Sequence, residues 1–111
     1  MPLINISTSK IIQNKEKLLK GSSKLLSKLT NKPEKFVMVI LNDSLPMYFS
    51  DKENSCCFVE IKSIGSLAPQ IFADSISEYL SIELKIPIER IYINFQDVQS
   101  SMWAWNGKTF G

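Results

Sequence analysis

The chain has 111 residues, of which 44% are hydrophobic and 22% are charged, and its formal net charge is +2 at pH 7. This composition predicts one folded domain over residues 1–111, and it excludes disorder and the strongly basic surface typical of nucleic-acid binders. Histidine is absent and only four glycines occur, which removes Ser-His and Cys-His nucleophile pairs and phosphate-cradling loops, so we expect no metal and no cofactor.

The predicted elements follow one order twice. The first half predicts a strand over residues 3–7, a helix over about 14–30 that stops before Pro33, and a strand over 36–42. The second half predicts a strand over 56–64, a helix over about 67–84 that stops before Pro87, and a strand over 90–96. Five residues recur fifty-four positions later, which suggests a duplication: Ser23, Leu26, Ser27, Pro33 and Asp43 match Ser77, Leu80, Ser81, Pro87 and Asp97.

Both helices are amphipathic, with apolar residues three and four apart on one core-facing stripe. The stripes are Leu18, Leu19, Ser22, Leu25, Leu26 and Leu29 in the first helix, and Phe72, Ile76, Tyr79, Leu80 and Leu84 in the second. In the last strand Ile91, Ile93 and Phe95 alternate toward the helices. Tyr92 and Asn94 therefore point to the opposite face.

This layout predicts an α+β fold in which two helices cover one face of a four-stranded sheet. The strand that begins at Phe36 is apolar on both faces as far as Leu41, as expected of a central strand buried on both sides. The second sheet face needs a cover, and the economical one is further copies of this chain in a closed homo-oligomer. A different protein bound to that apolar face is the alternative.

The remaining sequence features concern location and the two cysteines. The apolar run over residues 36–41 is too short to span a bilayer, and Lys10 interrupts the N-terminal segment before a secretory signal forms. We expect a cytoplasmic protein with no signal peptide and no membrane partner, and non-classical secretion stays open. Cys56 and Cys57 are adjacent, a spacing that suits neither zinc nor a disulfide framework, so both are predicted to be small buried apolar residues.

Five short segments occur in order across nearly the whole chain: MPLINIS at the start, NKP after the first helix, SIGS after the third strand, RIYINFQD in the last strand and WNGKTF at the end. Together they resemble the macrophage migration inhibitory factor family of the tautomerase superfamily. The resemblance implies a homotrimer with an active site at each subunit interface. It also implies an isomerase, a keto–enol tautomerase that acts on 2-oxo acids of the phenylpyruvate type.

Pro2 is the residue to which the resemblance gives the chemistry. Methionine is normally removed before a small second residue, which would leave the proline nitrogen as a free amine, whereas a retained Met1 makes it an amide without a basic lone pair. An α-amino group has a pKa of about 7.7–8.0, so burial or a nearby cation must lower the pKa before the amine can be a base at neutral pH. The resemblance places Lys32 and Ile64 beside Pro2. From the residues alone, Pro2 is equally the first residue of an edge strand.

The resemblance implies further site residues. The Lys32 ammonium and the Ile64 backbone N–H would hold the substrate carboxylate and the developing enolate oxygen. Tyr92 and Asn94 would enter the pocket from the neighbouring subunit. The pocket lining would include Phe36, Trp103 and Phe110. Without the resemblance, Lys32 is a cation at a helix C-terminus, and Tyr92 with Asn94 is a polar strand face.

Three departures from the family pattern limit what carries over. The cysteines do not form a Cys-x-x-Cys motif, so no thiol–disulfide oxidoreductase activity is expected. Phe36 stands where the family often has a tyrosine, and Ser66 replaces a common lysine, so the orientation of the substrate and the charge of the rim are expected to differ. Trp103 replaces a smaller apolar residue, which predicts either a narrower pocket or an indole that seals the subunit interface.

The C-terminal segment predicts a hairpin. Asn106-Gly107 is a turn signal that lets the strand double back, and Trp105 is expected to anchor it against the next subunit.

Two other hypotheses stay open. The trimer and its pocket could serve protein contacts, as in the cytokine members of the family, and Pro2→Ala would then leave the biological effect intact. A ferredoxin-like RNA-binding module is also built from duplicated strand-helix-strand units. The sheet-face residues Tyr92, Asn94 and Gln96 do not supply the basic aromatic face that such a module needs, so no nucleic-acid partner is expected.

Overall fold

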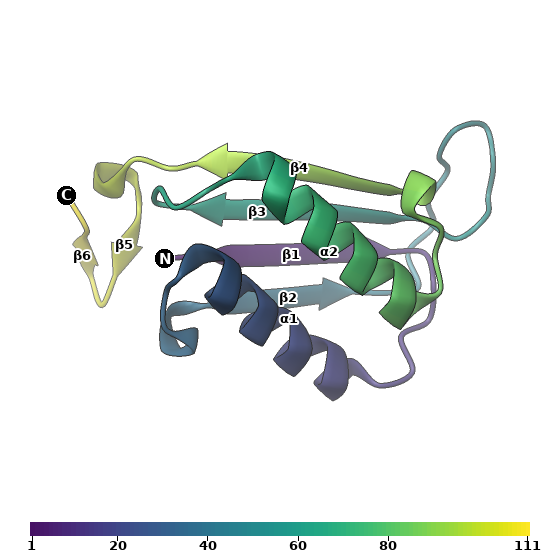
Figure 1. Ribbon diagram of the computed structural model, residues 1–111, viewed down its shortest axis with the longest axis horizontal. Helices are drawn as coiled ribbons and strands as arrows, with labels where there is room; N and C mark the ends of the chain where they lie inside the picture. The colour runs from purple at the N-terminus through teal and green to yellow at the C-terminus, as the bar shows by residue number, and fades with distance from the viewer.

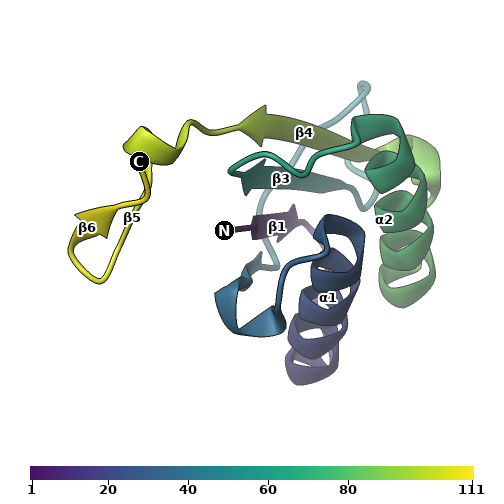
Figure 2. The same ribbon diagram turned by 60° about the vertical axis from the view of Figure 1, so that its left-hand side comes forward.

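The computed structural model describes residues 1–111 as a four-stranded sheet with two helices on one face (Figures 1 and 2). The strands are β1 (Leu3–Thr8), β2 (Met38–Asn42), β3 (Cys57–Ser63) and β4 (Ile91–Asp97), in the order β2-β1-β3-β4. β1 is parallel to β2 and antiparallel to β3, and β3 is parallel to β4. The helices are α1 (Lys15–Thr30) and α2 (Pro69–Leu84). The predicted α+β class is confirmed.

The two halves of the chain repeat in backbone detail. Both helices end at a residue with left-handed backbone, Asn31 (φ 57°) and Lys85 (φ 55°), fifty-four positions apart. Each is followed by a proline and a 3-10 turn, η1 (Glu34–Phe36) in the first half and η2 (Ile88–Arg90) in the second. The duplication indicated by the sequence is therefore also present in the conformation of the chain.

The core lies between the sheet and the two helices. Every fourth residue of each helix is buried: Leu18, Ser22, Leu26 and Thr30 in α1, and Phe72, Ile76, Leu80 and Leu84 in α2. Burial of an apolar side chain of this size contributes about 1.5–3 kcal/mol. The predicted stripes differ from the structure at Leu19, which is 37% exposed, because it lies one position away from the buried row.

The prediction that the second strand is central in the sheet is wrong, and the expected cover of its outward face by further copies of the chain stays a prediction. Residues 34–36 form η1, so β2 starts at Met38, and β2 is an edge strand. Its outward side chains Met38 and Ile40 are 60% and 37% exposed. The reason is that the halves pair through their first strands, β1 and β3, which leaves the second strand of each half at an edge.

Two aspartates at matching positions fix the loops that lead into the helices. The Asp43 carboxylate accepts a hydrogen bond from the Ile12 N–H at 2.9 Å, and the Asp97 carboxylate accepts one from the Gly65 N–H at 2.9 Å. Each aspartate lies at the end of the second strand of its half. The shared sequence position therefore has a shared structural role.

Cys56 and Cys57 are free thiols and are 1% and 2% exposed, which confirms the prediction of small buried apolar residues. Neither α1 nor α2 combines the length and the apolar content that a membrane-crossing helix requires.

The C-terminal segment projects from the main body (Figure 2). After the 3-10 turn η3 (Ser100–Met102), β5 (Ala104–Trp105) and β6 (Lys108–Thr109) form a separate two-stranded antiparallel sheet. Asn106 and Gly107 both have positive φ, 53° and 80°, as a two-residue hairpin turn requires. The predicted hairpin is confirmed.

Candidate functional site

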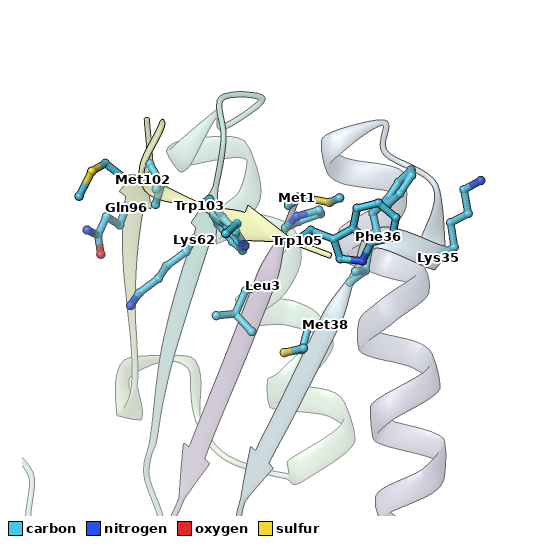
Figure 3. A pocket seen from close by; sticks show the side chains of 14 residues that line it. Met1, Leu3, Lys35, Phe36, Met38, Lys62, Gln96, Met102, Trp103 and Trp105 are labelled. Atoms are coloured by element: carbon cyan, nitrogen blue, oxygen red, sulfur yellow. The ribbon is translucent and has the colours of Figure 1, made fainter. Parts of the chain in front are cut away.

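A cavity of about 730 Å³ lies where the N-terminus meets the C-terminal hairpin (Figure 3). Its walls come from the start of β1, from η1 and β2, and from η3 and β5, and one side chain each of β3 and β4 also contributes. Ten of its 14 lining residues are hydrophobic, and none is acidic. The cavity therefore favours a ligand with an apolar body and a negative charge.

Pro2 lines this cavity. Its side chain is fully buried, and its carbonyl oxygen accepts a hydrogen bond from the Met38 N–H at 3.1 Å. This bond continues the parallel pairing of β1 with β2. The backbone at Pro2 is therefore fixed by hydrogen bonding to β2.

The surroundings of the N-terminus disfavour a protonated amine. Burial, and secondly the Lys32 cation, lower the pKa of the Met1 α-amino group below its usual value of 8.0. Lys32 is held in place by the end of α1: its N–H donates to the Ser27 carbonyl oxygen at 3.2 Å, and the Ser27 hydroxyl donates to the Lys32 carbonyl oxygen. Desolvation and a like charge both favour a neutral amine here.

Three of the predicted site residues line the cavity together: Pro2, Phe36 and Trp103. Figure 3 shows Trp105 next to Met1 and Phe36, and Trp103 next to Lys62. The indoles cover the N-terminus from the side opposite the helices. Within one chain, these aromatic rings already narrow the space beside Pro2.

Ile64 and Phe110 lie outside the lining. Ile64 follows the last residue of β3, and Phe110 is 39% exposed at the C-terminus, where its N–H donates to the carbonyl oxygens of Trp103 at 3.0 Å and Ser100 at 3.2 Å. The expected pocket role of Phe110 is therefore not seen within one chain. The expected carboxylate-binding role of Ile64 stays a prediction.

Tyr92 and Asn94 lie on the open face of the sheet, away from the cavity of their own chain. Tyr92 pairs across the sheet with Phe58, near the end of β1 that is farthest from Pro2, and is 62% exposed. Its ring packs on Phe49 with the ring centres 4.5 Å apart. Their expected entry into a neighbouring subunit's pocket stays a prediction.

Sequence reasoning missed several lining residues. Leu3, Lys62 and Gln96 form one cross-strand row on the open face, next to Met38, and all four line the cavity. Alternation along each strand predicts their face, but only the register between strands brings them into one row. Met102 is the other notable omission, since nothing in the sequence indicated that η3 turns over the N-terminus.

The sheet of two strand-helix-strand halves, with Pro2 in an apolar cavity at one end, is the arrangement of a tautomerase-superfamily protein. The family model described as macrophage migration inhibitory factor matches residues 1–111, and the chain belongs to this family. It is 38% identical over 116 residues to the macrophage migration inhibitory factor homolog of Brugia malayi, with 100% of both chains covered. It is 34% identical over 96 residues to the factor of Xenopus tropicalis, with 84% of each covered.

Solved structures show the same likeness. The homologue from Prochlorococcus marinus is 42% identical and superposes with a TM-score of 0.93 over 98% of this chain and 99% of that one. The factor from Trichinella spiralis is 25% identical, with a TM-score of 0.91 over 97% of this chain and 99% of that one.

Proposed function

We propose that the protein is a keto–enol tautomerase for 2-oxo acids of the phenylpyruvate type, with Pro2 as the general base after removal of Met1. The observation that carries the proposal is that Pro2 lines an apolar cavity, next to the Met1 α-amino group, whose pKa is lowered by burial and by Lys32. Removal of Met1 would expose the pyrrolidine nitrogen as a secondary amine at that point. Membership of the tautomerase superfamily supports the same chemistry.

The reaction needs one proton moved twice. The Pro2 lone pair removes a proton from the carbon next to the ketone, the C–H electrons form the carbon–carbon double bond, and the carbonyl oxygen becomes an enolate. The pyrrolidinium then returns the proton to that oxygen, which gives the enol and regenerates the free amine. The Lys32 ammonium and the Ile64 N–H are the proposed donors to the substrate carboxylate and the enolate oxygen, where negative charge develops.

The active assembly is proposed to be a homotrimer. The helices cover one sheet face, and the other face exposes apolar side chains on every strand but β1, including Met38, Phe58 and Tyr92. A second copy laid on this face would bring Tyr92 and Asn94 toward a neighbour's cavity. Light scattering coupled to gel filtration tests this directly: the expected mass is three times the chain mass of 12.6 kDa, and a monomer at micromolar concentration would contradict it.

The catalytic proposal is tested by three forms of the protein. Intact mass spectrometry first establishes that Met1 is absent from the wild type. An ultraviolet assay of phenylpyruvate tautomerisation then compares the wild type, Pro2→Ala, and a form with a blocked, extended N-terminus. General-base catalysis contributes about 100-fold or more, so both altered forms should lose at least that factor while they keep the wild-type assembly.

Equal rates in all three forms would contradict the role of Pro2 as general base. In that case, retention of a protein-binding activity by Pro2→Ala would favour the binding trimer instead.

A further inference from the structure

Ser63, the last residue of β3, carries a buried hydroxyl without a partner. Its side chain is 0% exposed, and its Oγ makes no hydrogen bond. Ser22 on α1 is the other residue with such a hydroxyl. Buried hydroxyl groups in folded proteins nearly always have a partner, so the Ser63 hydroxyl needs an explanation.

The register of the sheet places Ser63 opposite Pro2. Leu3 pairs with Lys62 as the last pair of the antiparallel β1–β3 ladder, so a continuation by one position would set Pro2 against Ser63. Directly opposed side chains have Cβ atoms about 4.5–5.5 Å apart, and both of these side chains are buried. The Ser63 backbone is fixed, since its carbonyl oxygen accepts the Val98 N–H at 2.8 Å.

Removal of Met1 would change the hydrogen-bonding groups at the N-terminus. With Met1 attached, the Pro2 nitrogen is a tertiary amide with no N–H to donate. Removal of Met1 creates a secondary amine with one N–H and one lone pair, and protonation adds a second N–H. The mature chain therefore acquires, at this place, the donor that Ser63 lacks.

We propose that Ser63 is a positioning residue for the catalytic base, and that its hydroxyl oxygen accepts a hydrogen bond from the Pro2 N–H of the mature protein. This inference rests on the proposed function. With one N–H held by Ser63, the lone pair of the neutral amine, or the second N–H of the protonated one, is directed into the cavity. The base is then aimed at the substrate in both halves of the reaction.

Ser63 also balances the charges around the amine. The cations near the site are Lys32, Lys35 and Lys62, and none of the cavity-lining residues is acidic. Asp97 is the partner of Ser63 in the β3–β4 ladder, but its carboxylate accepts a hydrogen bond from the Gly65 N–H. A hydrogen bond accepted from a charged N–H is stronger than one from a neutral N–H. The Ser63 hydroxyl would therefore favour the protonated amine, whereas the lysines and burial disfavour it. The amine then stays able to take up the substrate proton that it must return.

The test compares Ser63→Ala and Ser63→Thr with the wild type, and uses Ser22→Ala as the matched control for the loss of a buried, unpartnered hydroxyl. The measurement is the pH profile of kcat/KM for phenylpyruvate. Ser63→Ala should move the acidic limb about one pH unit lower, because the protonated amine loses an acceptor. Ser63→Thr keeps a hydroxyl and should keep the wild-type limb, as should Ser22→Ala.

A second measurement separates this inference from the proposed function. The ¹⁵N chemical shift of labelled Pro2 reports its titration without any turnover, so the Ser63 hydrogen bond is read even if phenylpyruvate is not a substrate. A lower Pro2 midpoint in Ser63→Ala supports the inference, and identical midpoints in Ser63→Ala, Ser22→Ala and the wild type overturn it. If Ser63→Ala does not fold, Ser63→Cys gives the same comparison, since a thiol is a weak acceptor.

Discussion

The guanidinium of Arg90 donates a hydrogen bond to the carbonyl oxygen of Phe49 at 2.6 Å and lies 5.1 Å from the centre of its ring. Arg90 also donates to the carbonyl oxygen of Asn54 at 2.6 Å, and to those of Ser55 and Lys52 at 3.4 Å. One cation that is only 8% exposed thus holds the loop between β2 and β3 against the start of β4. Since Phe49 packs on Tyr92, this bond network also orients a residue of the proposed neighbouring pocket.

Replacement of Arg90 by methionine should destabilise the protein by about 2–4 kcal/mol, because several buried carbonyl oxygens lose a charged donor. Urea unfolding followed by circular dichroism measures the loss. Arg90→Lys keeps the charge but cannot reach as many acceptors, so its free energy of unfolding should lie between those of the wild type and Arg90→Met. An unchanged midpoint in Arg90→Met would show that the loop holds itself in place.

Gly21 of α1 lies against Tyr79 of α2, and a Cβ at position 21 would overlap the Tyr79 hydroxyl and approach its Cζ to 3.1 Å. Gly→Ala in a helix normally stabilises by about 1 kcal/mol. We expect Gly21→Ala to lose most or all of this gain in the wild type and to regain part of it in a Tyr79→Phe background, where the hydroxyl is gone but Cζ stays close. Thermal unfolding of the four proteins of this cycle measures the difference, and an equal gain in both backgrounds would mean that the helices adjust freely.

The stability of the strand-to-helix loop should depend on pH through Asp43. The backbone hydrogen bond from Ile12, and then the Lys15 cation 3.6 Å away, lower the pKa of Asp43 below its usual value of 3.8. The carboxylate therefore stabilises the fold above pH 3.8, and this contribution is lost as the pH falls through the lower, folded-state pKa. An asparagine at this position would still accept the Ile12 N–H but would not titrate. Asp43→Asn should therefore lose less stability than the wild type as the pH is lowered from about 5 to about 2 in urea unfolding. If the stabilities of the wild type and Asp43→Asn fall in parallel as the pH is lowered, the Asp43 carboxylate does not contribute to the pH dependence.

The cysteines should be unreactive in the native state. Burial, with the adjacent Cys56, raises the pKa of the Cys57 thiol to about 12, and only the thiolate attacks disulfide reagents. In a colour assay with an aromatic disulfide at mildly alkaline pH, neither thiol should react until urea unfolds the chain. Fast reaction of one thiol per chain in buffer would show that this end of β3 opens.

Trp103 should limit the size of the substrate. Its indole lines the cavity next to Pro2, and Trp103→Val would enlarge the space. The variant should lower KM for 2-oxo acids with a bulkier aryl group relative to phenylpyruvate, because the added ring atoms enter the vacated volume. Tyr48→Val, which removes an exposed ring outside this cavity, is the control. An unchanged preference in Trp103→Val would assign its indole to the subunit interface.

Much of the fold was predictable because its signals are local. Leu18, Leu26, Phe72 and Leu80 recur at helical spacing, and the buried face of each helix follows from that spacing alone. The strand faces follow from alternation in the same way. The pocket residues Pro2, Phe36 and Trp103 were found through five short segments that resemble a family, whereas periodicity alone left Pro2 as an ordinary strand residue.

The amino-acid sequence by itself determined the duplication, the elements and the side of each element that faces the core, because these depend on neighbours within a few residues along the chain. Only the tertiary structure decided that β2 is an edge strand, that Lys62 and Gln96 join the cavity, and that Ser63 lies opposite Pro2. These relationships depend on which strands pair and in which register, and such pairing is set by packing between segments far apart in the chain.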